Sequence, residues 1–106
     1  MAAATYQGAT VGRVCNTMAG ARFDLDGVDH HVAANFGANY LHGGVRAWDK
    51  RMWSLESIKV TPNAAAVTLS LASESGEEGY PGAVAVRARF SLTAQCGIFW
   101  LLGRCK

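Results

Sequence analysis

The chain has 106 residues, of which 50% are hydrophobic and 17% are charged. This composition is typical of a single globular domain, because it supplies a core, and it excludes a disordered tail. Ten Lys and Arg residues against eight Asp and Glu residues give a net charge of +2, and the basic residues are scattered. Without a basic strip that follows a phosphate backbone, we expect no nucleic-acid partner.

Targeting and metal-binding segments are not evident. No apolar run approaches the ~18 residues that a membrane span needs, so we expect no membrane partner. Residues 1–7 contain neither the basic start nor the apolar segment of a secretory signal, which predicts a cytoplasmic location. The cysteines, Cys15, Cys96 and Cys105, are odd in number and form no C-x-x-C pair. This pattern disfavours a disulfide framework and a structural zinc site, and we predict no metal ligands.

The first predicted element in chain order is a β-hairpin over residues 22–32. Asp26-Gly27 lies between two short β-prone segments, and this pair is favoured where a two-residue turn needs positive φ at both positions. His30 and His31 are neighbours on the second strand, so their side chains point to opposite faces. We therefore expect that they do not bind one metal ion together.

A long loop is predicted next, over residues 33–47, because glycine and asparagine cluster there. A loop of this length in a compact domain is usually functional. Two strands are expected after it, at residues 53–60 and 67–71, from β-branched and aromatic content and from alternation. Residues 76–82 form a second irregular connection.

The clearest strand pattern is at residues 83–93. Apolar and polar residues alternate there, as a half-buried strand requires. We expect one face to point to the core and the other to solvent; the first contains Val84, Val86, Phe90 and Leu92, and the second contains Arg87 and Arg89. No amphipathic helix is predicted, so the fold class is all-β. Only about five strands are expected, which is few for a closed barrel or sandwich.

Two loop segments contain candidates for chemistry. His42 lies beside two glycines that let a ligand approach closely, although a loop histidine is more often solvated than ligand-binding. Glu77 and Glu78 are neighbouring carboxylates, a pattern that a general base can use. Because Gly76 and Gly79 flank them, we expect them instead to lie in water on a turn.

Two further patterns have structural interpretations. The glycine-rich segment at residues 8–13 lacks the lysine and hydroxyl of a phosphate-binding loop. The aromatic side chains of the middle of the chain are able to stack on a sugar or to fill a core, and core filling is the expectation in an all-β domain. These aromatic residues are Phe36, Tyr40, Trp48 and Trp53.

The motifs become specific when they are taken together in chain order. From about residue 6 to residue 93 this order closely resembles that of the aldose 1-epimerase (galactose mutarotase) family. The motifs that carry the resemblance are Gly-Ala-Thr-Val-Gly-Arg-Val at 8–14, Asn16, Leu25-Asp26-Gly27, Ala34-Asn35, Leu41-His42-Gly43-Gly44, Asp49-Lys50, Trp53 and Gly-Glu-Glu-Gly-Tyr-Pro-Gly at 76–82.

The resemblance implies a fragment of the galactose mutarotase-like antiparallel β-sandwich. It also implies an isomerase that interconverts the α and β anomers of hexoses such as galactose and glucose. A general acid and a general base open the sugar ring, without metal or cofactor. The substrate-binding positions that carry over are Asn16, Thr17 and His42. Thr17 stands where the family has arginine, so one hydroxyl replaces a five-donor cation and we expect weaker sugar affinity.

The resemblance covers only part of the family's domain. We divide the chain into a partial aldose 1-epimerase domain at residues 1–93 and a divergent tail at residues 94–106. The family's catalytic histidine and glutamate have no counterparts here, so no catalytic residue is predicted and the chain alone is expected to be inactive. The alternative is a non-catalytic carbohydrate-binding or interaction remnant. Exposed sheet edges and the uncharged segment at residues 98–102 predict self-association.

Overall fold

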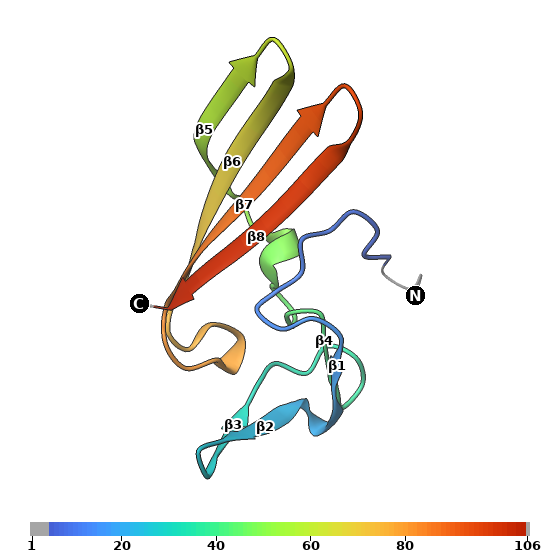
Figure 1. The fold of residues 1–106 in the computed structure, drawn as a ribbon. Coiled ribbons are helices and arrows are strands. Elements are labelled where there is room, and N and C mark those ends of the chain that lie inside the picture. The colour runs from blue at the N-terminus through green and yellow to red at the C-terminus, as the bar shows by residue number, and fades with distance from the viewer. Residues whose placement is uncertain (1–4, 106) are drawn as a thin grey trace. The chain divides into compact units, whose positions relative to one another are not determined.

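The computed structural model describes residues 5–105, which form antiparallel β-sheets (Figure 1). Residues 1–4 of the N-terminal segment considered above lie outside this range. The strands within it are β1 (Thr17–Met18), β2 (Arg22–Leu25), β3 (Val28–His31), β4 (Tyr40–Leu41), β5 (Ser54–Thr61), β6 (Ala64–Ser73), β7 (Val84–Thr93) and β8 (Gly97–Cys105). Its helical elements are three-residue 3-10 turns, η1 (Ala19–Ala21), η2 (Trp48–Lys50) and η3 (Glu77–Gly79). The predicted all-β class is confirmed.

The described residues divide into two compact units. Unit 1 contains residues 5–51 together with the segment 78–80, and unit 2 contains residues 52–77 and 81–105. Unit 1 thus has the short strands β1 to β4, and unit 2 has the long strands β5 to β8. No helix within residues 5–105 has the length and apolar character that crossing a membrane requires. The predicted division at residue 93 is a different boundary and stays a prediction.

The predicted hairpin forms in unit 1 from β2 and β3, which pair residue for residue. Asp26 and Gly27 have φ angles of 54° and 76°, the left-handed backbone that a two-residue turn needs at both positions. The N–H of Gly27 donates to Asp24 Oδ1 at 3.2 Å. The turn chemistry of Asp26-Gly27 therefore predicted this element correctly.

The core of unit 1 is small and aromatic. Tyr40 is fully buried, and Tyr80 from the returning segment packs edge-on against it with ring centroids 5.9 Å apart. Phe23 of the hairpin stacks on Tyr80 at 5.7 Å, and Ala21 and Val32 complete the cluster. Segment 78–80 thus anchors this unit through an aromatic side chain.

Trp48 is also buried, and its ring explains why one position of the glycine-rich segment, residue 12, is a glycine. A Cβ on Gly12 would overlap the Trp48 ring, so Gly12 permits close packing of the backbone on the indole. Core filling is confirmed for Tyr40 and Trp48. It is wrong for Phe36, which is 59% exposed because it lies in a tight turn where it pairs with Asn39.

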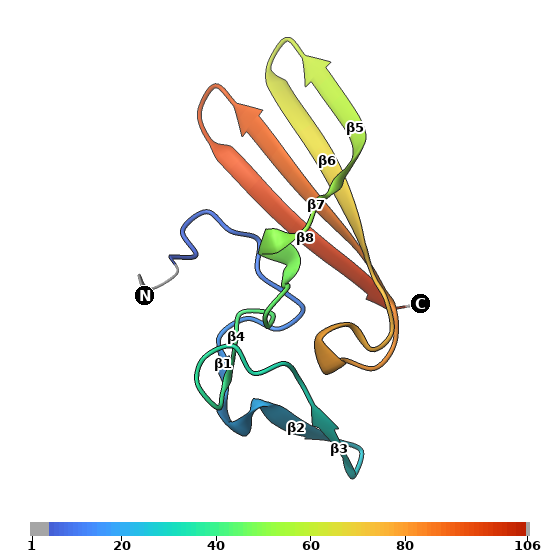
Figure 2. The same cartoon turned by 180° about the vertical axis from the view of Figure 1, so that it is seen from behind.

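Unit 2 is one four-stranded antiparallel sheet in the order β5-β6-β7-β8, seen from both sides in Figures 1 and 2. The central strands β6 and β7 pair along their whole length without a register shift. β5 contains a β-bulge between Leu55 and Ser57, whereas β8 pairs with β7 residue for residue. The predicted tail therefore supplies a strand to this sheet.

Alternation in β7 is confirmed, but the predicted burial holds for only half of the strand. Val86 is 1% exposed, whereas Phe90 and Leu92 on the same face are 41% and 64% exposed. Arg87 and Arg89 lie on the opposite face and are exposed, as predicted. The period of two determines which face a side chain takes, whereas burial depends on what packs against that face.

Candidate functional site

Asn16 and His42 contact each other although they are 26 residues apart. The Asn16 N–H donates to His42 Nδ1 at 2.9 Å, and the His42 N–H donates to the Asn16 carbonyl oxygen at 3.2 Å. The pair is built where β1 and β4 align antiparallel, with Thr17 opposite Leu41. Two of the three predicted substrate-binding residues are thus held together by reciprocal hydrogen bonds.

This arrangement selects the tautomer of the imidazole. Because Nδ1 of His42 accepts a hydrogen bond, the proton of the neutral ring is on Nε2. Asn16 Oδ1 accepts the Thr17 N–H at 2.9 Å, which orients the carboxamide and leaves its NH₂ group as the outward donor. Within residues 5–105, neither His42 Nε2 nor Asn16 Nδ2 has a hydrogen-bond partner. The pair therefore presents two donor groups, the His42 Nε2–H and the Asn16 NH₂.

Both residues have the left-handed backbone, with φ angles of 69° at Asn16 and 52° at His42. Asparagine and histidine are among the non-glycine residues that tolerate this conformation best. Tyr6 packs edge-on against the imidazole with ring centroids 4.7 Å apart, and Lys50 Nζ lies 5.3 Å from the centroid of the Tyr6 ring. The imidazole is therefore oriented by packing as well as by hydrogen bonds.

Asn35 holds the chain on both sides of His42. Its Nδ2 donates to the carbonyl oxygens of Leu41 at 2.8 Å and Gly44 at 3.0 Å, and its Oδ1 accepts the Leu41 N–H at 2.6 Å. The side chain is half-buried. One carboxamide thus satisfies three backbone groups of a loop that has little regular structure of its own.

Glu78 holds the next part of the same loop. Its carboxylate accepts the N–H groups of Val45 at 2.9 Å and Arg46 at 3.0 Å, and its carbonyl accepts the Ala33 N–H at 2.9 Å. A Cβ on Gly44 would overlap this carboxylate, so only glycine leaves room for it. Glu78 therefore clamps the His42 loop.

The prediction that Glu77 and Glu78 lie in water on a turn is wrong. Both side chains are half-buried, and Glu77 accepts a hydrogen bond from the Ser73 hydroxyl in unit 2. The glycines around them do form a turn, with Glu78 itself in the left-handed conformation at a φ of 51°. Flanking residues indicated the turn, but Glu77 bonds a hydroxyl 4 residues before it, and Glu78 bonds backbone amides 33 and 32 residues away.

Tyr40 fixes the segment that precedes Asn16. Its hydroxyl donates to the Val14 carbonyl oxygen at 2.7 Å and accepts the Val14 N–H at 3.3 Å. Burial raises the pKa of the Tyr40 phenol above its ordinary value of 10.0, and burial also raises the pKa of Tyr80. Both rings therefore stay neutral throughout the physiological range and contribute packing and hydrogen bonds without charge.

The remaining candidates lie apart from this pair or contribute less. Thr17 is exposed next to Asn16 and offers one hydroxyl. His30 stacks on Phe23 at 5.0 Å, whereas His31 lies 3.2 Å from Asp29, so the two histidines take different faces as predicted. No group of three or more His, Cys, Asp or Glu side chains within residues 5–105 forms a metal site. All three cysteines are free.

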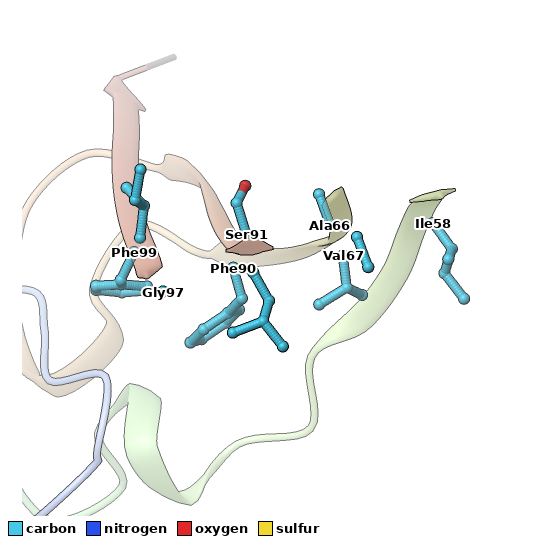
Figure 3. Close-up of a pocket in the computed structure, with 10 residues that line it drawn as sticks. Ile58, Ala66, Val67, Phe90, Ser91, Gly97 and Phe99 are labelled. Atoms are coloured by element: carbon cyan, nitrogen blue, oxygen red, sulfur yellow. The ribbon is translucent and has the colours of Figure 1, made fainter. Parts of the chain in front are cut away.

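The sheet of unit 2 also has a surface hollow, of about 510 Å³ (Figure 3). Ile58, Val67, Phe90 and Phe99 line it with their side chains on one side of the sheet, whereas the hydroxyl of Ser91 points to the other side. The lining thus offers hydrocarbon and aromatic surface without directed donors. A sugar site needs placed polar groups, so this hollow is a poor match for a sugar.

Asn35 and Glu78 both hold the loop around His42, and the sequence did not identify either of them as a site residue. Both were present in the motifs Ala34-Asn35 and Gly-Glu-Glu-Gly-Tyr-Pro-Gly, but only as parts of an ordered pattern. Asn35 lies 6 residues from Leu41, and Glu78 lies 33 residues from Val45. No local spacing rule connects such positions.

Comparison with known proteins decides the family. A family model described as aldose 1-epimerase matches residues 1–101 of the chain. The chain belongs to the aldose 1-epimerase family. It is 45% identical over 87 residues to galactose mutarotase from Sus scrofa, an alignment that covers 82% of this chain and 24% of that protein. It is 44% identical to galactose mutarotase from Homo sapiens with the same coverage. For aldose 1-epimerase from Escherichia coli strain K12 the identity is 34% over 90 residues, with 85% and 25% covered.

Solved structures agree. A galactose 1-epimerase from Lactobacillus acidophilus NCFM matches with a TM-score of 0.81 and 25% identity, over 90% of this chain and 28% of that one. An aldose epimerase homologue from C. elegans matches with a TM-score of 0.77 and 25% identity, over 91% and 29% of the two chains. The chain therefore spans about a quarter of the length of the relatives that it matches.

Proposed function

We propose that the Asn16–His42 pair binds a hexose and is this chain's share of an aldose 1-epimerase site. The observation that carries the proposal is the reciprocal hydrogen bonding of the pair, which leaves His42 Nε2–H and Asn16 Nδ2–H as outward donors. Sugar hydroxyl and ring oxygens accept such donors. The names of the relatives, galactose mutarotase and aldose 1-epimerase, support a sugar of this class.

The pair is organised before a ligand arrives. Asn35 and Glu78 hold the backbone around His42 through five hydrogen bonds between 2.6 and 3.0 Å. A site that is already ordered loses less conformational entropy on binding, so few donors are enough for a weak but oriented complex. In the anomerisation reaction this pair would orient the sugar, while a separate acid and base move the protons.

We further propose that the 106-residue chain binds hexoses without accelerating their anomerisation. A general acid and a general base each contribute about 10²- to 10⁴-fold, and the positions implied by the family resemblance are not matched among these residues. The alternative function is a non-catalytic carbohydrate-binding or interaction remnant. Binding without turnover supports a carbohydrate-binding role for the isolated chain, and absence of both supports the interaction role.

The binding experiment is an NMR titration with galactose up to about 100 mM, a range suited to millimolar affinity. We expect amide shifts at Asn16 and His42 that saturate. His42→Ala and Asn16→Gly should abolish them; glycine keeps the left-handed backbone and removes only the carboxamide. His31→Ala is the matched control, because this histidine is exposed on the hairpin. No saturable shift in the unaltered chain would refute sugar binding.

Thr17 offers a gain-of-affinity test. Thr17→Arg should tighten galactose binding by about 1–3 kcal/mol, the scale of charge-assisted hydrogen bonds. Thr17→Lys is the matched control, because it adds the same charge without the planar fork that grips two oxygens. Equal gains from both variants would show general electrostatics in place of a bidentate contact.

Turnover is tested separately by polarimetry of freshly dissolved α-galactose. We expect the rate with the 106-residue chain to equal the buffer rate. A rate that rises with protein concentration and falls in His42→Ala would show that a catalytic group is present in the chain. That outcome would overturn the proposed inactivity and leave the proposed binding intact.

A further inference from the structure

The two edges of the unit 2 sheet differ in the features that block further pairing. β5 forms one edge, and it has a β-bulge at Leu55/Ser57 and the charged residues Glu56 and Lys59. β8 forms the other edge, pairs with β7 without a register shift and has no charge from residue 97 to residue 103. Bulges, charges and prolines are the usual means of protecting an edge strand. By this comparison β5 is protected and β8 is open.

The open edge of β8 presents backbone hydrogen-bonding groups. The Thr93 N–H donates to the Cys96 carbonyl oxygen at 2.8 Å, which makes this a hydrogen-bonded pair of the β7–β8 hairpin. Hydrogen-bonded and non-bonded pairs alternate along antiparallel strands, so even-numbered residues of β8 direct their peptide groups to β7. Odd-numbered residues from Gly97 to Cys105 direct theirs to the outer edge. Within residues 5–105, no strand pairs with that edge.

β8 is apolar on both faces. Phe99 and Leu101 share the face of Phe90 and Ala88, opposite which they lie in the register. Trp100 and Leu102 lie on the other face, opposite Arg89 and Arg87. The exposed fractions of the large β8 side chains lie between 42% and 67%; they are Ile98, Phe99, Trp100, Leu101 and Leu102. An antiparallel strand with one face in solvent usually has polar side chains on that face, and β8 does not have this composition.

We propose that β8 pairs antiparallel with β8 of a second copy of this chain, with the two-fold axis at Leu101. A two-fold axis normal to the sheet keeps each face on its own side, so opposed residues must have the same parity. With the axis at Leu101, all residues of β8 pair, and Phe99 lies opposite Gly103 of the other copy. Two four-stranded sheets then form one continuous sheet.

This register is self-complementary. Phe99 covers a glycine, which has no side chain to pack, and Trp100 lies opposite Leu102 on the other face. Arg104 lies opposite Ile98, so no like charges are opposed. The strand thus supplies both halves of each contact.

The available area agrees with a reversible dimer. Five large side chains that are each about half exposed offer roughly 100 Å² apiece, from residues of about 200 Å². Two copies therefore have at most about 1,000 Å² of this side-chain surface to bury, because pairing at one edge covers only part of each side chain, and backbone pairing is additional. This value is near the lower limit of specific interfaces. We expect the fraction of dimer to rise with protein concentration.

Sedimentation equilibrium between about 5 and about 200 μM with a reductant tests the dimer. We expect monomer and dimer only, and Leu101→Lys should weaken the dimer at least about tenfold, because it places two like charges directly opposite each other. Val60→Lys is the matched control, since Val60 is 75% exposed on the other edge strand, and its dimer should be unchanged. Circular dichroism checks the fold of each variant.

Cysteine cross-linking tests the register even if Leu101→Lys does not fold. In a chain with Cys15→Ser, Cys96→Ser and Cys105→Ser, single variants Phe99→Cys, Leu101→Cys and Gly103→Cys are oxidised. We expect a covalent dimer only from Leu101→Cys, because the other positions are about 13 Å from their own copies in this register. A monomer at the highest concentration, open-ended oligomers, equal weakening by Val60→Lys, or cross-links at 99 or 103 alone would overturn the proposal.

Discussion

Different kinds of interaction stabilise the inside of each of the two units. In unit 2, strands of eight to ten residues form a regular ladder of backbone pairs. In unit 1, the strands have two to four residues, and single side chains hold the irregular backbone. Asn35, Tyr40 and Glu78 make most of these contacts. The stability of unit 1 should therefore depend on individual polar side chains, whereas the stability of unit 2 should change little when one of its own polar side chains is removed.

The largest expected effect is at Asn35. Asn35→Ala removes the side-chain partner of the Leu41 N–H and of the Gly44 carbonyl oxygen, and one of the two donors to the Leu41 carbonyl oxygen, so we expect the unfolding free energy of unit 1 to fall by about 2–4 kcal/mol. Asn63→Ala, at an exposed turn of unit 2, should stay within about 0.5 kcal/mol. Amide hydrogen exchange over residues 33–46 measures the difference. Equal effects of the two variants would remove the contrast between the units.

A smaller effect is expected at Glu78. Glu78→Gln replaces one acceptor oxygen by an NH₂ group that faces a backbone N–H, which costs about 1–3 kcal/mol in unit 1. The amide resonances of Val45 and Arg46 should move. Glu77→Gln is the control, because its carboxamide oxygen still accepts from the Ser73 hydroxyl. If the Val45 and Arg46 resonances move in Glu77→Gln and are unchanged in Glu78→Gln, then Glu78 is not the residue that holds these amides.

This contrast also explains which elements the sequence predicted. The hairpin at Asp26-Gly27 and the strands β5, β6 and β7 were predictable, because turn preference and a period of two are local signals. The two-residue strands β1 and β4 were not, since they form only where Asn16 and His42 meet. Local patterns thus predicted the strands of unit 2 better than the short strands of unit 1.

The candidate site was predictable only through the resemblance. Chemistry alone favoured a solvated His42, and the family motif placed it with Asn16, which it contacts. The function of Glu78 in the loop was not predictable, because 33 residues separate its carboxylate from the amide of Val45. The exposure of Phe90 was missed for a related reason: a strand pattern does not state what covers a face.

Tyr40 and Tyr80 sharpen the comparison within the core of unit 1. Tyr40→Phe removes the hydroxyl that holds Val14 and should cost about 1–2 kcal/mol. The Tyr80 hydroxyl is buried and has no hydrogen-bond partner within residues 5–105, so Tyr80→Phe should cost nothing or stabilise the fold. Urea unfolding of both variants measures this. A larger loss from Tyr80→Phe would reveal a contact of that hydroxyl.

The same two phenols contribute a pH dependence to unit 1, and residues 52–77 and 81–105 of unit 2 contain no tyrosine. Burial raises the pKa of both above 10.0, so the folded state holds the protons more tightly than the unfolded state. This contribution to stability is complete below pH 10 and is lost as pH rises above it. Hydrogen exchange in unit 1 should therefore accelerate above pH 10 more than base catalysis predicts. Tyr40→Phe should reduce the excess, and an unchanged excess would assign it to other groups.

The smallest expected effect is on the ion pair of unit 2. Arg87 Nε lies 2.8 Å from a Glu56 carboxylate oxygen, and this contact raises the pKa of the guanidinium, which is already protonated at every accessible pH. The Arg87 side chain is 64% exposed, so water and salt screen the pair, and the ladder of β6 and β7 persists without it. We expect Arg87→Ala to leave the thermal midpoint unchanged at low and high salt. A salt-dependent loss would show that side-chain contacts also hold unit 2, and the two units would then differ in degree only.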